Sequence, residues 1–126
     1  MGRALGKPPG RSLTEAVRLD GGAAWTWSAN PGSTVYGETV RKGKHGEWRR
    51  WDPRRSKVGS GLLRTTGAPE RLLPAPGDHV LYLGAGHGTT VSHVHDVVCH
   101  DGAPGRVVAV DLSPRCLRDL TRMAHA

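Results

Sequence analysis

The sequence predicts an α/β fold built on a parallel sheet and preceded by a small N-terminal β region. Two compact apolar runs, His79–Leu83 and Arg106–Val110, have the length and composition of strands buried on both faces. Between them, residues 89–99 carry valines at helical spacing. A strand–helix–strand unit of this kind pairs its two strands in parallel. With 126 residues, the chain is one domain at most.

The first half of the chain divides into two segments. Residues 1–23 contain Gly, Pro, Arg and Ala without periodicity, and we expect them to form a flexible leader. Residues 24–54 contain short β-prone pieces at 34–36 and 47–49. A turn-forming stretch between these pieces, residues 42–46, indicates a small hairpin or meander.

The second half, residues 55–126, is expected to hold the main α/β unit. Residues 55–64 favour one short helix, although its two glycines weaken that prediction. After the second apolar run, Ser113 is suited to cap a final helix, with Pro114 in its first turn. The apolar side of this last helix would consist of Leu117, Leu120 and Met123.

A glycine-rich loop directly follows the first predicted strand. Its sequence, Gly84-Ala85-Gly86-His87-Gly88, lets a ligand approach the backbone, and the following helix start offers free N–H groups. Asp111 ends the next strand at the same edge of the sheet, where a carboxylate can accept both hydroxyls of a ribose. The spacing Gly-x-Gly-x-Gly differs from the dinucleotide pattern and favours S-adenosylmethionine over NAD. An NAD-dependent oxidoreductase is the weaker alternative.

Positive charge is concentrated in one part of the chain. The net charge is +7, and residues 41–57 contain eight Lys and Arg against two acidic residues. Trp48 and Trp51 lie in the same run. Guanidinium groups suit phosphates and flat rings can stack on bases, so this run is a candidate RNA-binding segment. The alternative is a solvated basic face whose tryptophans point into the core. The arginines expected to contact RNA are Arg49, Arg50, Arg54 and Arg55.

Neither a metal site nor a membrane segment is indicated. His93, His95, Cys99 and His100 lie close in sequence, but on a helix His93 and His95 point ~200° apart, and no metal-binding spacing is present. We expect surface or helix-packing histidines. Cys99 and Cys116 are expected to be free thiols without an activating partner. No apolar run reaches the ~18 residues of a membrane span and no signal sequence is evident, which favours a cytoplasmic protein.

Several strings of the sequence resemble those of archaeal fibrillarins. They are residues 35–38, 48–53, 55–57, 80–85, 88–94 and 110–115, and they occur in family order. Gly-Thr-Thr-Val-Ser-His-Val and Trp-Asp-Pro-x-Arg-Ser-Lys are specific to that family. The resemblance implies a Rossmann-like, S-adenosylmethionine-dependent 2′-O-methyltransferase of rRNA and tRNA. Its implied setting is a box C/D guide ribonucleoprotein with guide RNA, a Nop-domain scaffold protein and a kink-turn-binding protein.

The resemblance also implies roles for individual residues. Lys57 matches the first lysine of the family's Lys-Asp-Lys-His catalytic set. Thr89 and Thr90 would lie against the methionine part of the cofactor, while Asp111 and Leu112 would hold the ribose and flank the adenine. His87 is a departure, because the family has a small residue there. The full set of expected cofactor-binding residues is Gly84, Ala85, Gly86, Gly88, Thr89, Thr90, Asp111 and Leu112.

The family domain has about seven strands, so residues 55–126 correspond to the N-terminal half of a methyltransferase domain. Counterparts of the later Asp, Lys and His of the catalytic set are not found in the 126 residues. We therefore expect an incomplete sheet. The alternative to a methyltransferase is a truncated, non-catalytic fibrillarin-like fragment that binds only RNA or a partner protein.

Overall fold

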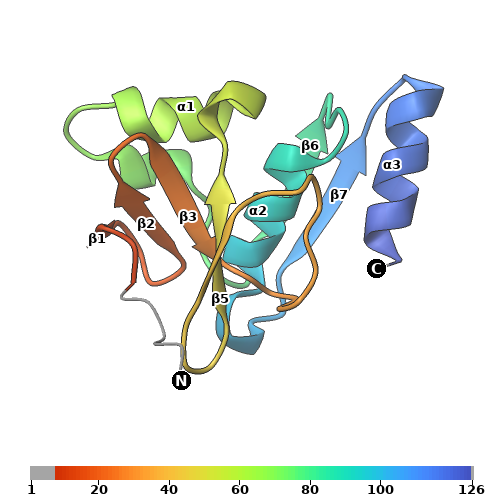
Figure 1. Ribbon diagram of the computed structural model, residues 1–126. Helices are drawn as coiled ribbons and strands as arrows, with labels where there is room; N and C mark the ends of the chain where they lie inside the picture. The colour runs from red at the N-terminus through yellow and green to blue at the C-terminus, as the bar shows by residue number, and fades with distance from the viewer. Residues whose placement is uncertain (1–7, 126) are drawn as a thin grey trace.

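The N-terminal half of the chain forms a five-stranded antiparallel sheet (Figure 1). The computed structural model describes residues 8–125. The sheet has the strand order β1-β2-β3-β5-β4. Its strands are β1 (Arg11–Ser12), β2 (Val17–Asp20), β3 (Ala23–Trp27), β4 (Val40–Lys42) and β5 (Glu47–Trp51).

Residues 8–23 differ from the flexible leader that the composition suggested. Strand β2 alternates buried and half-buried residues, and it pairs with β3 across a tight turn at Gly21 and Gly22. Gly21 has φ +57°, a conformation that glycine adopts without strain. Burial of Val17 and Leu19 stabilises this hairpin. Residues 1–7 of the expected leader lie outside the described residues.

A hairpin forms around the expected turn, where β4 and β5 pair in antiparallel fashion across residues 43–46. Residues 34–36 do not form the expected strand, because residue 34 is irregular and residues 35–37 form bends. There the backbone N–H groups of Val35 and Tyr36 donate to the Glu38 carboxylate, which replaces the ladder bonds of a strand.

A short connection links the N-terminal sheet to helix α1 (Lys57–Arg64) through the 3-10 turn η1 (Pro53–Arg55). Ser56 caps α1, because its Oγ accepts a hydrogen bond from the Gly59 N–H. Leu62 on α1 is buried against Leu19, Ala24 and Trp51 of the sheet. A second turn, η2 (Pro69–Leu72), leads to the C-terminal half.

The C-terminal half alternates strand and helix, as the sequence predicted. It consists of β6 (His79–Leu83), α2 (Thr89–Val98), the turn η3 (His100–Gly102), β7 (Arg106–Val110) and α3 (Pro114–Ala124). Strands β6 and β7 pair in parallel, with Val80 opposite Val107. Ser113 caps α3 and Pro114 occupies its first turn.

One face of the β6–β7 pair is exposed in the part of the chain that the structure describes, residues 8–125. The prediction that both strands are buried on both faces is therefore wrong there. Tyr82, Val107 and Ala109 point to the other face and pack on Ala85, Val91 and Leu120. Helices α2 and α3 cover only that face. The exposed apolar side chains of the opposite face are Leu81, Leu83, Val108 and Val110.

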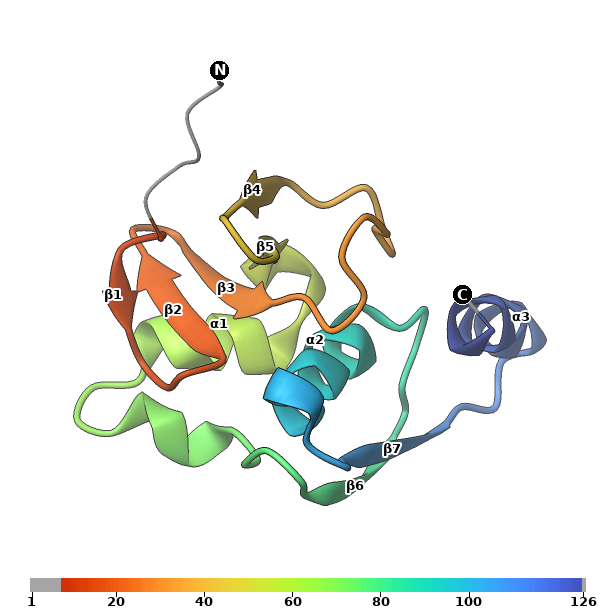
Figure 2. The same cartoon turned by 90° about the horizontal axis from the view of Figure 1, so that it is seen from below.

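Helix α2 lies in the middle of the molecule, between the N-terminal sheet and the β6–β7 pair (Figure 2). It contacts β3 and β5 on one side and β7 on the other, and Val91, Val94, Val97 and Val98 are all buried. No helix within the described residues has the length and apolar character needed to cross a membrane.

Candidate cofactor site

The glycine loop between β6 and α2 has a backbone that requires glycine. Gly84, Gly86 and Gly88 have φ values of +71°, +61° and +99°. A Cβ atom added at Gly84 or Gly86 would meet nothing within 4 Å, so the loop is open on that side. At Gly88 a Cβ atom would lie 3.0 Å from Met123 Sδ, so the loop packs closely against α3 there.

Asp111 follows β7 and lies directly beside this loop. Its Oδ2 accepts a hydrogen bond from the Gly86 N–H at 2.8 Å, and its Oδ1 accepts one from the Ser113 N–H at 2.8 Å. The N–H groups of Ser113 and Gly86 lower the pKa of Asp111, so the carboxylate is ionised at neutral pH. Each carboxylate oxygen keeps a further lone pair that can accept a hydroxyl. Leu112, next in the chain, is exposed.

The start of α2 also contacts the start of α1. Thr90 Oγ1 donates a hydrogen bond of 2.6 Å to Ser56 Oγ, and both residues are buried. Lys57 follows Ser56 as the first residue of α1, and it is exposed. The N-terminus of α1, which carries Lys57, therefore lies beside the N-terminus of α2, which follows the glycine loop. The contact through Ser56 was not predicted from the sequence.

Two of the expected cofactor-binding residues turn their side chains inward. The Ala85 methyl group belongs to the apolar cluster with Val91 and Leu120. Thr89 is buried, and its carbonyl oxygen accepts a hydrogen bond from Ser92 Oγ. At these positions, a ligand in the open loop would meet backbone groups more than side chains.

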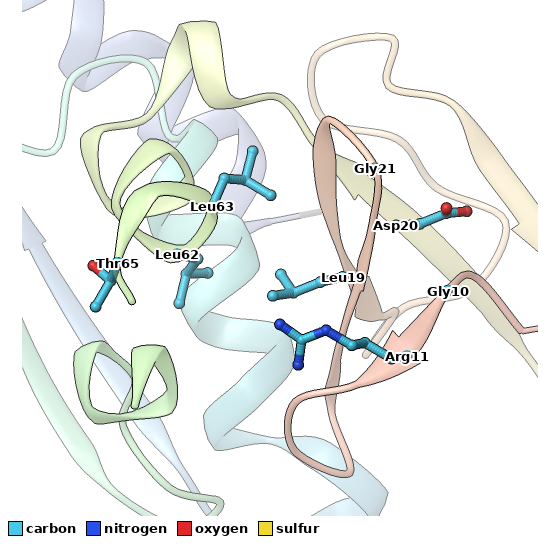
Figure 3. Close-up of a pocket in the computed structure, with 8 residues that line it drawn as sticks. All are labelled: Gly10, Arg11, Leu19, Asp20, Gly21, Leu62, Leu63 and Thr65. Atoms are coloured by element: carbon cyan, nitrogen blue, oxygen red, sulfur yellow. The ribbon is translucent and has the colours of Figure 1, made fainter. Parts of the chain in front are cut away.

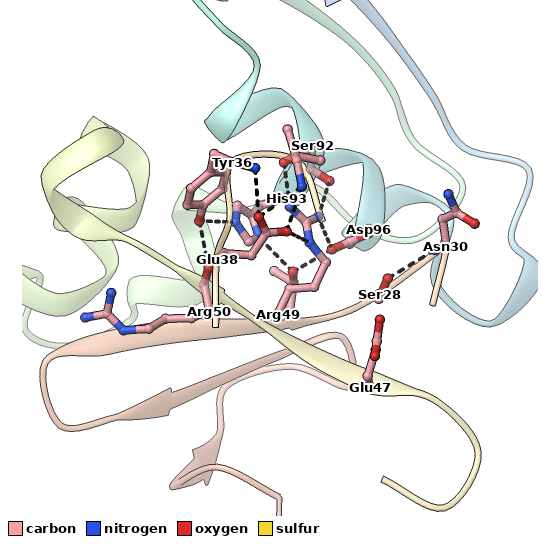
Figure 4. A network of polar contacts seen from close by, with 12 residues as sticks. Ser28, Asn30, Tyr36, Glu38, Glu47, Arg49, Arg50, Ser92, His93 and Asp96 are labelled. Atoms are coloured by element: carbon pink, nitrogen blue, oxygen red, sulfur yellow. Dashed lines mark hydrogen bonds and ion pairs between the residues drawn. The ribbon is translucent and has the colours of Figure 1, made fainter. Parts of the chain in front are cut away.

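Arg49 does not lie on the surface, and the prediction that it contacts RNA is wrong. Only 3% of its side chain is exposed. Arg49 Nε donates to Glu38 Oε2 at 2.6 Å, and Nη1 donates to Asp96 Oδ2 at 2.8 Å (Figure 4). Nη2 donates to Ser92 Oγ at 2.9 Å. Strand β5 alternates in burial, and Arg49 lies on its inner face with Trp51.

The two carboxylates that hold Arg49 differ in their environment. Burial raises the pKa of Asp96 and outweighs the opposite effect of Arg49. Burial also acts to raise the pKa of Glu38, but the Tyr36 N–H and Arg49 outweigh it and the pKa is lowered. The Arg49 guanidinium, whose own pKa is raised despite burial, joins the N-terminal sheet to α2.

His93 is a helix-packing residue within the same network. Its ring is fully buried, stacks on Trp51 at 4.9 Å between centroids, and makes hydrogen bonds to Thr26 Oγ1 and the Tyr36 hydroxyl. Burial, with a smaller effect of Arg49, holds the pKa of His93 well below its usual range. The imidazole is therefore neutral at pH 7, and it donates from one nitrogen and accepts at the other.

The neutral His93 leads to a prediction about pH and stability. The unfolded chain binds a proton at this histidine near pH 6.5, whereas the folded chain does not. The free energy of unfolding should therefore fall as the pH drops below about 6.5, by up to about 1.4 kcal/mol per pH unit from this group. Urea unfolding at pH 7.5, 6.0 and 5.0 would measure the slope. The His93→Gln variant should lose this part of the slope, and an identical slope in the variant would contradict the assignment.

The remaining predicted arginines are more accessible than Arg49. The side chain of Arg54 is 84% exposed, Arg55 is exposed and lies over the Tyr36 ring, and Arg50 is half-buried. A hollow beside η1 and α1 gathers several of these cations with Lys57. It is lined by Pro53, Arg54, Arg55, Ser56, Lys57, Ser60, Gly61 and Arg64.

A separate pocket lies between the β1–β2 strands and α1 (Figure 3). Its lining includes Arg11 and Asp20 but none of the residues predicted from the sequence as site residues. Among residues 8–125, no group of three or more His, Cys, Asp and Glu side chains is placed to hold a metal ion.

Comparison with known proteins identifies the family. The family model described as Fibrillarin matches residues 16–126. A fibrillarin-like rRNA/tRNA 2′-O-methyltransferase of Methanosarcina barkeri is 46% identical over 99 residues, which are 79% of this chain and 40% of that protein. The rRNA 2′-O-methyltransferase fibrillarin of Drosophila melanogaster is 48% identical over 98 residues, 75% of this chain and 27% of that protein.

Solved structures agree with this assignment. The crystal structure of Aeropyrum pernix fibrillarin with natively bound S-adenosyl-L-methionine matches with a TM-score of 0.69 and 36% identity, over 82% of this chain and 42% of that one. A fibrillarin/Nop5p complex matches with a TM-score of 0.65 and 32% identity, over 87% of this chain and 46% of that one. The chain thus spans less than half the length of these four proteins. It belongs to the fibrillarin family.

Proposed function

We propose that this chain carries the cofactor-binding half of an S-adenosylmethionine-dependent enzyme that methylates the 2′-hydroxyl of ribose in rRNA and tRNA. The observation that carries the proposal is the pairing of the open glycine loop with an ionised carboxylate, through the hydrogen bond from Gly86 N–H to Asp111 Oδ2. The fibrillarin of A. pernix, which binds S-adenosyl-L-methionine, supports the choice of cofactor.

The residues present fit this cofactor. In our proposal Asp111 accepts the ribose hydroxyls, exposed Leu112 flanks the adenine, and the backbone of the glycine loop and of Thr89 and Thr90 faces the methionine part. The loop is open at Gly84 and Gly86, where a side chain would occupy the space above the backbone. When bound, S-adenosylmethionine supplies an electrophilic methyl group.

Lys57 is proposed to act on the substrate ribose. It is exposed at the start of α1, and the adjacent Ser56 is hydrogen-bonded to Thr90 beside the cofactor loop. From there its amino group can orient the attacking 2′-hydroxyl or assist the loss of its proton. A purely electrostatic contact with a phosphate is the other role open to this lysine.

Binding of the cofactor by this chain tests the proposal directly. Isothermal titration should give saturable binding of S-adenosylmethionine and of S-adenosylhomocysteine, because both present the same ribose and adenine to Asp111 and the loop. NAD should not bind at the same concentrations, since the third glycine of the dinucleotide pattern is replaced by Thr89. Equal affinity for NAD, or no binding of either adenosyl compound, would contradict the proposal.

RNA contact is proposed for Arg50, Arg54 and Arg55. If Arg54 and Arg55 bind phosphates, RNA affinity should fall steeply with salt, and the Arg54→Ala, Arg55→Ala double variant should flatten the slope by about 1.4 for single strands. Filter binding of single-stranded RNA between low and high salt would measure this slope. Arg71→Ala, which removes an exposed cation from η2, is the matched control and should change the slope less.

The proposed setting is a guide ribonucleoprotein with a Nop-domain scaffold protein, box C/D guide RNA and a kink-turn-binding protein. The fibrillarin/Nop5p complex among the similar structures supports the scaffold partner. The second candidate function is a non-catalytic module that binds RNA or a partner. This second function predicts the same salt dependence of RNA affinity in the presence and in the absence of cofactor. It also predicts no methyl transfer to guide-paired RNA when labelled cofactor and the partner proteins are supplied.

A further inference from the structure

Three side chains with the chemistry of a nucleophile, a base and an orienting acid meet beside the glycine loop. His87 Nδ1 lies 2.6 Å from Asp119 Oδ2, and His87 Nε2 lies 3.6 Å from Cys116 Sγ. Cys116 and Asp119 are three residues apart on α3 and therefore share one face of that helix. The sequence did not predict that an imidazole would lie beside Cys116.

The Asp119 carboxylate fixes the orientation of the imidazole. A carboxylate that accepts from Nδ1–H keeps the proton on that nitrogen, which leaves Nε2 as the free acceptor that faces the thiol. Asp119 also lies 3.9 Å from Arg122 Nη1, one turn along α3. The side chain of His87 is 53% exposed and Cys116 is half-buried, so the cluster lies at the edge of the solvent-accessible surface.

A second acceptor lies near the thiol. The Asp111 carboxylate lies close enough to the Cys116 side chain for the thiol to contribute to the lowered pKa of Asp111, after the larger effects of the Ser113 and Gly86 N–H groups. Asp111 already accepts hydrogen bonds from the Ser113 and Gly86 N–H groups, which lower its pKa and make it a weak proton acceptor. The proton of a reacting Cys116 therefore goes to His87 Nε2, and Asp111 stays ionised.

Cys99 offers a contrast within the same chain. Its Sγ donates a weak hydrogen bond to the Gly105 carbonyl at 3.5 Å. Burial, with the nearby Asp96 charge, raises the pKa of the Cys99 thiol. Within residues 8–125, no imidazole forms a hydrogen bond to the Cys99 sulfur, so Cys99 serves as an internal reference for an unassisted thiol.

We propose that Cys116 is a site of covalent modification by small disulfides, with His87 as its base and Asp119 as a positioning residue. In the step, the thiol proton passes to His87 Nε2 and the Cys116 sulfur attacks one sulfur of the disulfide. A new S–S bond forms, the original S–S bond breaks, and the leaving thiolate takes up the proton. The small disulfide is reduced to one free thiol, and Cys116 is oxidised to a mixed disulfide. This site does not depend on the proposed methyltransferase function.

Oxidised glutathione is the probe for the experiment. The whole chain is incubated with it at neutral pH, and adducts at Cys116 and Cys99 are quantified by peptide mass spectrometry over time. We expect Cys116 to react at least about tenfold faster than Cys99. His87→Gln should slow the Cys116 reaction by about tenfold or more, because the base is lost. Asp119→Asn should slow it by a smaller factor of about three, since the base remains but loses its orienting partner.

Cys99→Ser is the matched control and should leave the Cys116 rate unchanged. Cys99 also reports on folding: if a variant unfolds, Cys99 becomes reactive and that variant is set aside. In that case the chain without substitutions provides the test: Cys116 should react faster in the folded chain than in the chain unfolded by urea. Equal rates for the two cysteines in the folded chain, or a Cys116 rate that is unaffected in folded His87→Gln, would overturn the proposal.

Discussion

Replacement of Arg49 by alanine is expected to lower the free energy of unfolding by about 3–5 kcal/mol, because it leaves two buried carboxylates without their cation. Glu38 and Asp96 lie 2.6 and 2.8 Å from the guanidinium, and each is less than 5% exposed in its side chain. A loss of this size is a large part of the stability of a small domain. Urea unfolding followed by tryptophan fluorescence would measure it, since Trp51 stacks on His93 in the same network.

The matched control for this prediction is Arg54→Ala. Arg54 belongs to the same basic run but is exposed, so its loss should change the free energy of unfolding by no more than about 0.5 kcal/mol. Arg49→Lys should fall between the two, because a lysine keeps the charge but lacks the planar fork that reaches Glu38, Asp96 and Ser92 together. Similar stabilities for Arg49→Ala and Arg54→Ala would contradict a structural role for Arg49.

Replacement of Asp111 by alanine is expected to weaken S-adenosylmethionine binding at least about tenfold, since charged hydrogen bonds contribute about 1.5–3 kcal/mol each. The same change removes the acceptor of the Gly86 and Ser113 N–H groups, so it also loosens the cofactor loop. Isothermal titration would measure the affinity, and circular dichroism would verify that the fold remains.

Asp101→Asn is the control for Asp111. Asp101 is exposed in the turn after α2 and has φ +54°, a conformation that asparagine also tolerates. It removes one carboxylate without touching the loop, so cofactor affinity should not change. An Asp111→Ala variant that is folded and binds with full affinity would show that the ribose hydroxyls are held elsewhere.

Much of the C-terminal half could be predicted because its signals are local. The apolar run at 79–83, the valine spacing of α2 and the Ser113-Pro114 start of α3 each define their element within a few residues. The N-terminal strands also carried a local signal that was missed. Val17–Asp20 alternates in polarity and is followed by Gly21-Gly22, a pattern typical of a tight hairpin.

The structural role of Arg49 could be predicted only in part from the local sequence. Alternation along Glu47–Trp51 places Arg49 on the same face as Trp51, so an inward arginine could have been inferred once Trp51 was assigned to the core. The partners of Arg49 could not have been inferred, because the bend before β4 brings Glu38 to it and α2 brings Asp96. The His87–Asp119 contact likewise depends on how α3 packs against the loop.

The network around Arg49 also sets an order of events during synthesis. Arg49 forms its ion pair with Asp96, which lies 47 residues later in the chain. Thr26 and the Ala29 N–H donate to the same carboxylate across 70 and 67 residues. When the N-terminal sheet has left the ribosome and α2 has not, the buried Arg49 guanidinium therefore lacks its partner Asp96. Contacts of such long sequence separation slow folding. The nascent chain should stay sensitive to protease until residue 96 has left the exit tunnel, and then gain protection in the N-terminal sheet and α2 together.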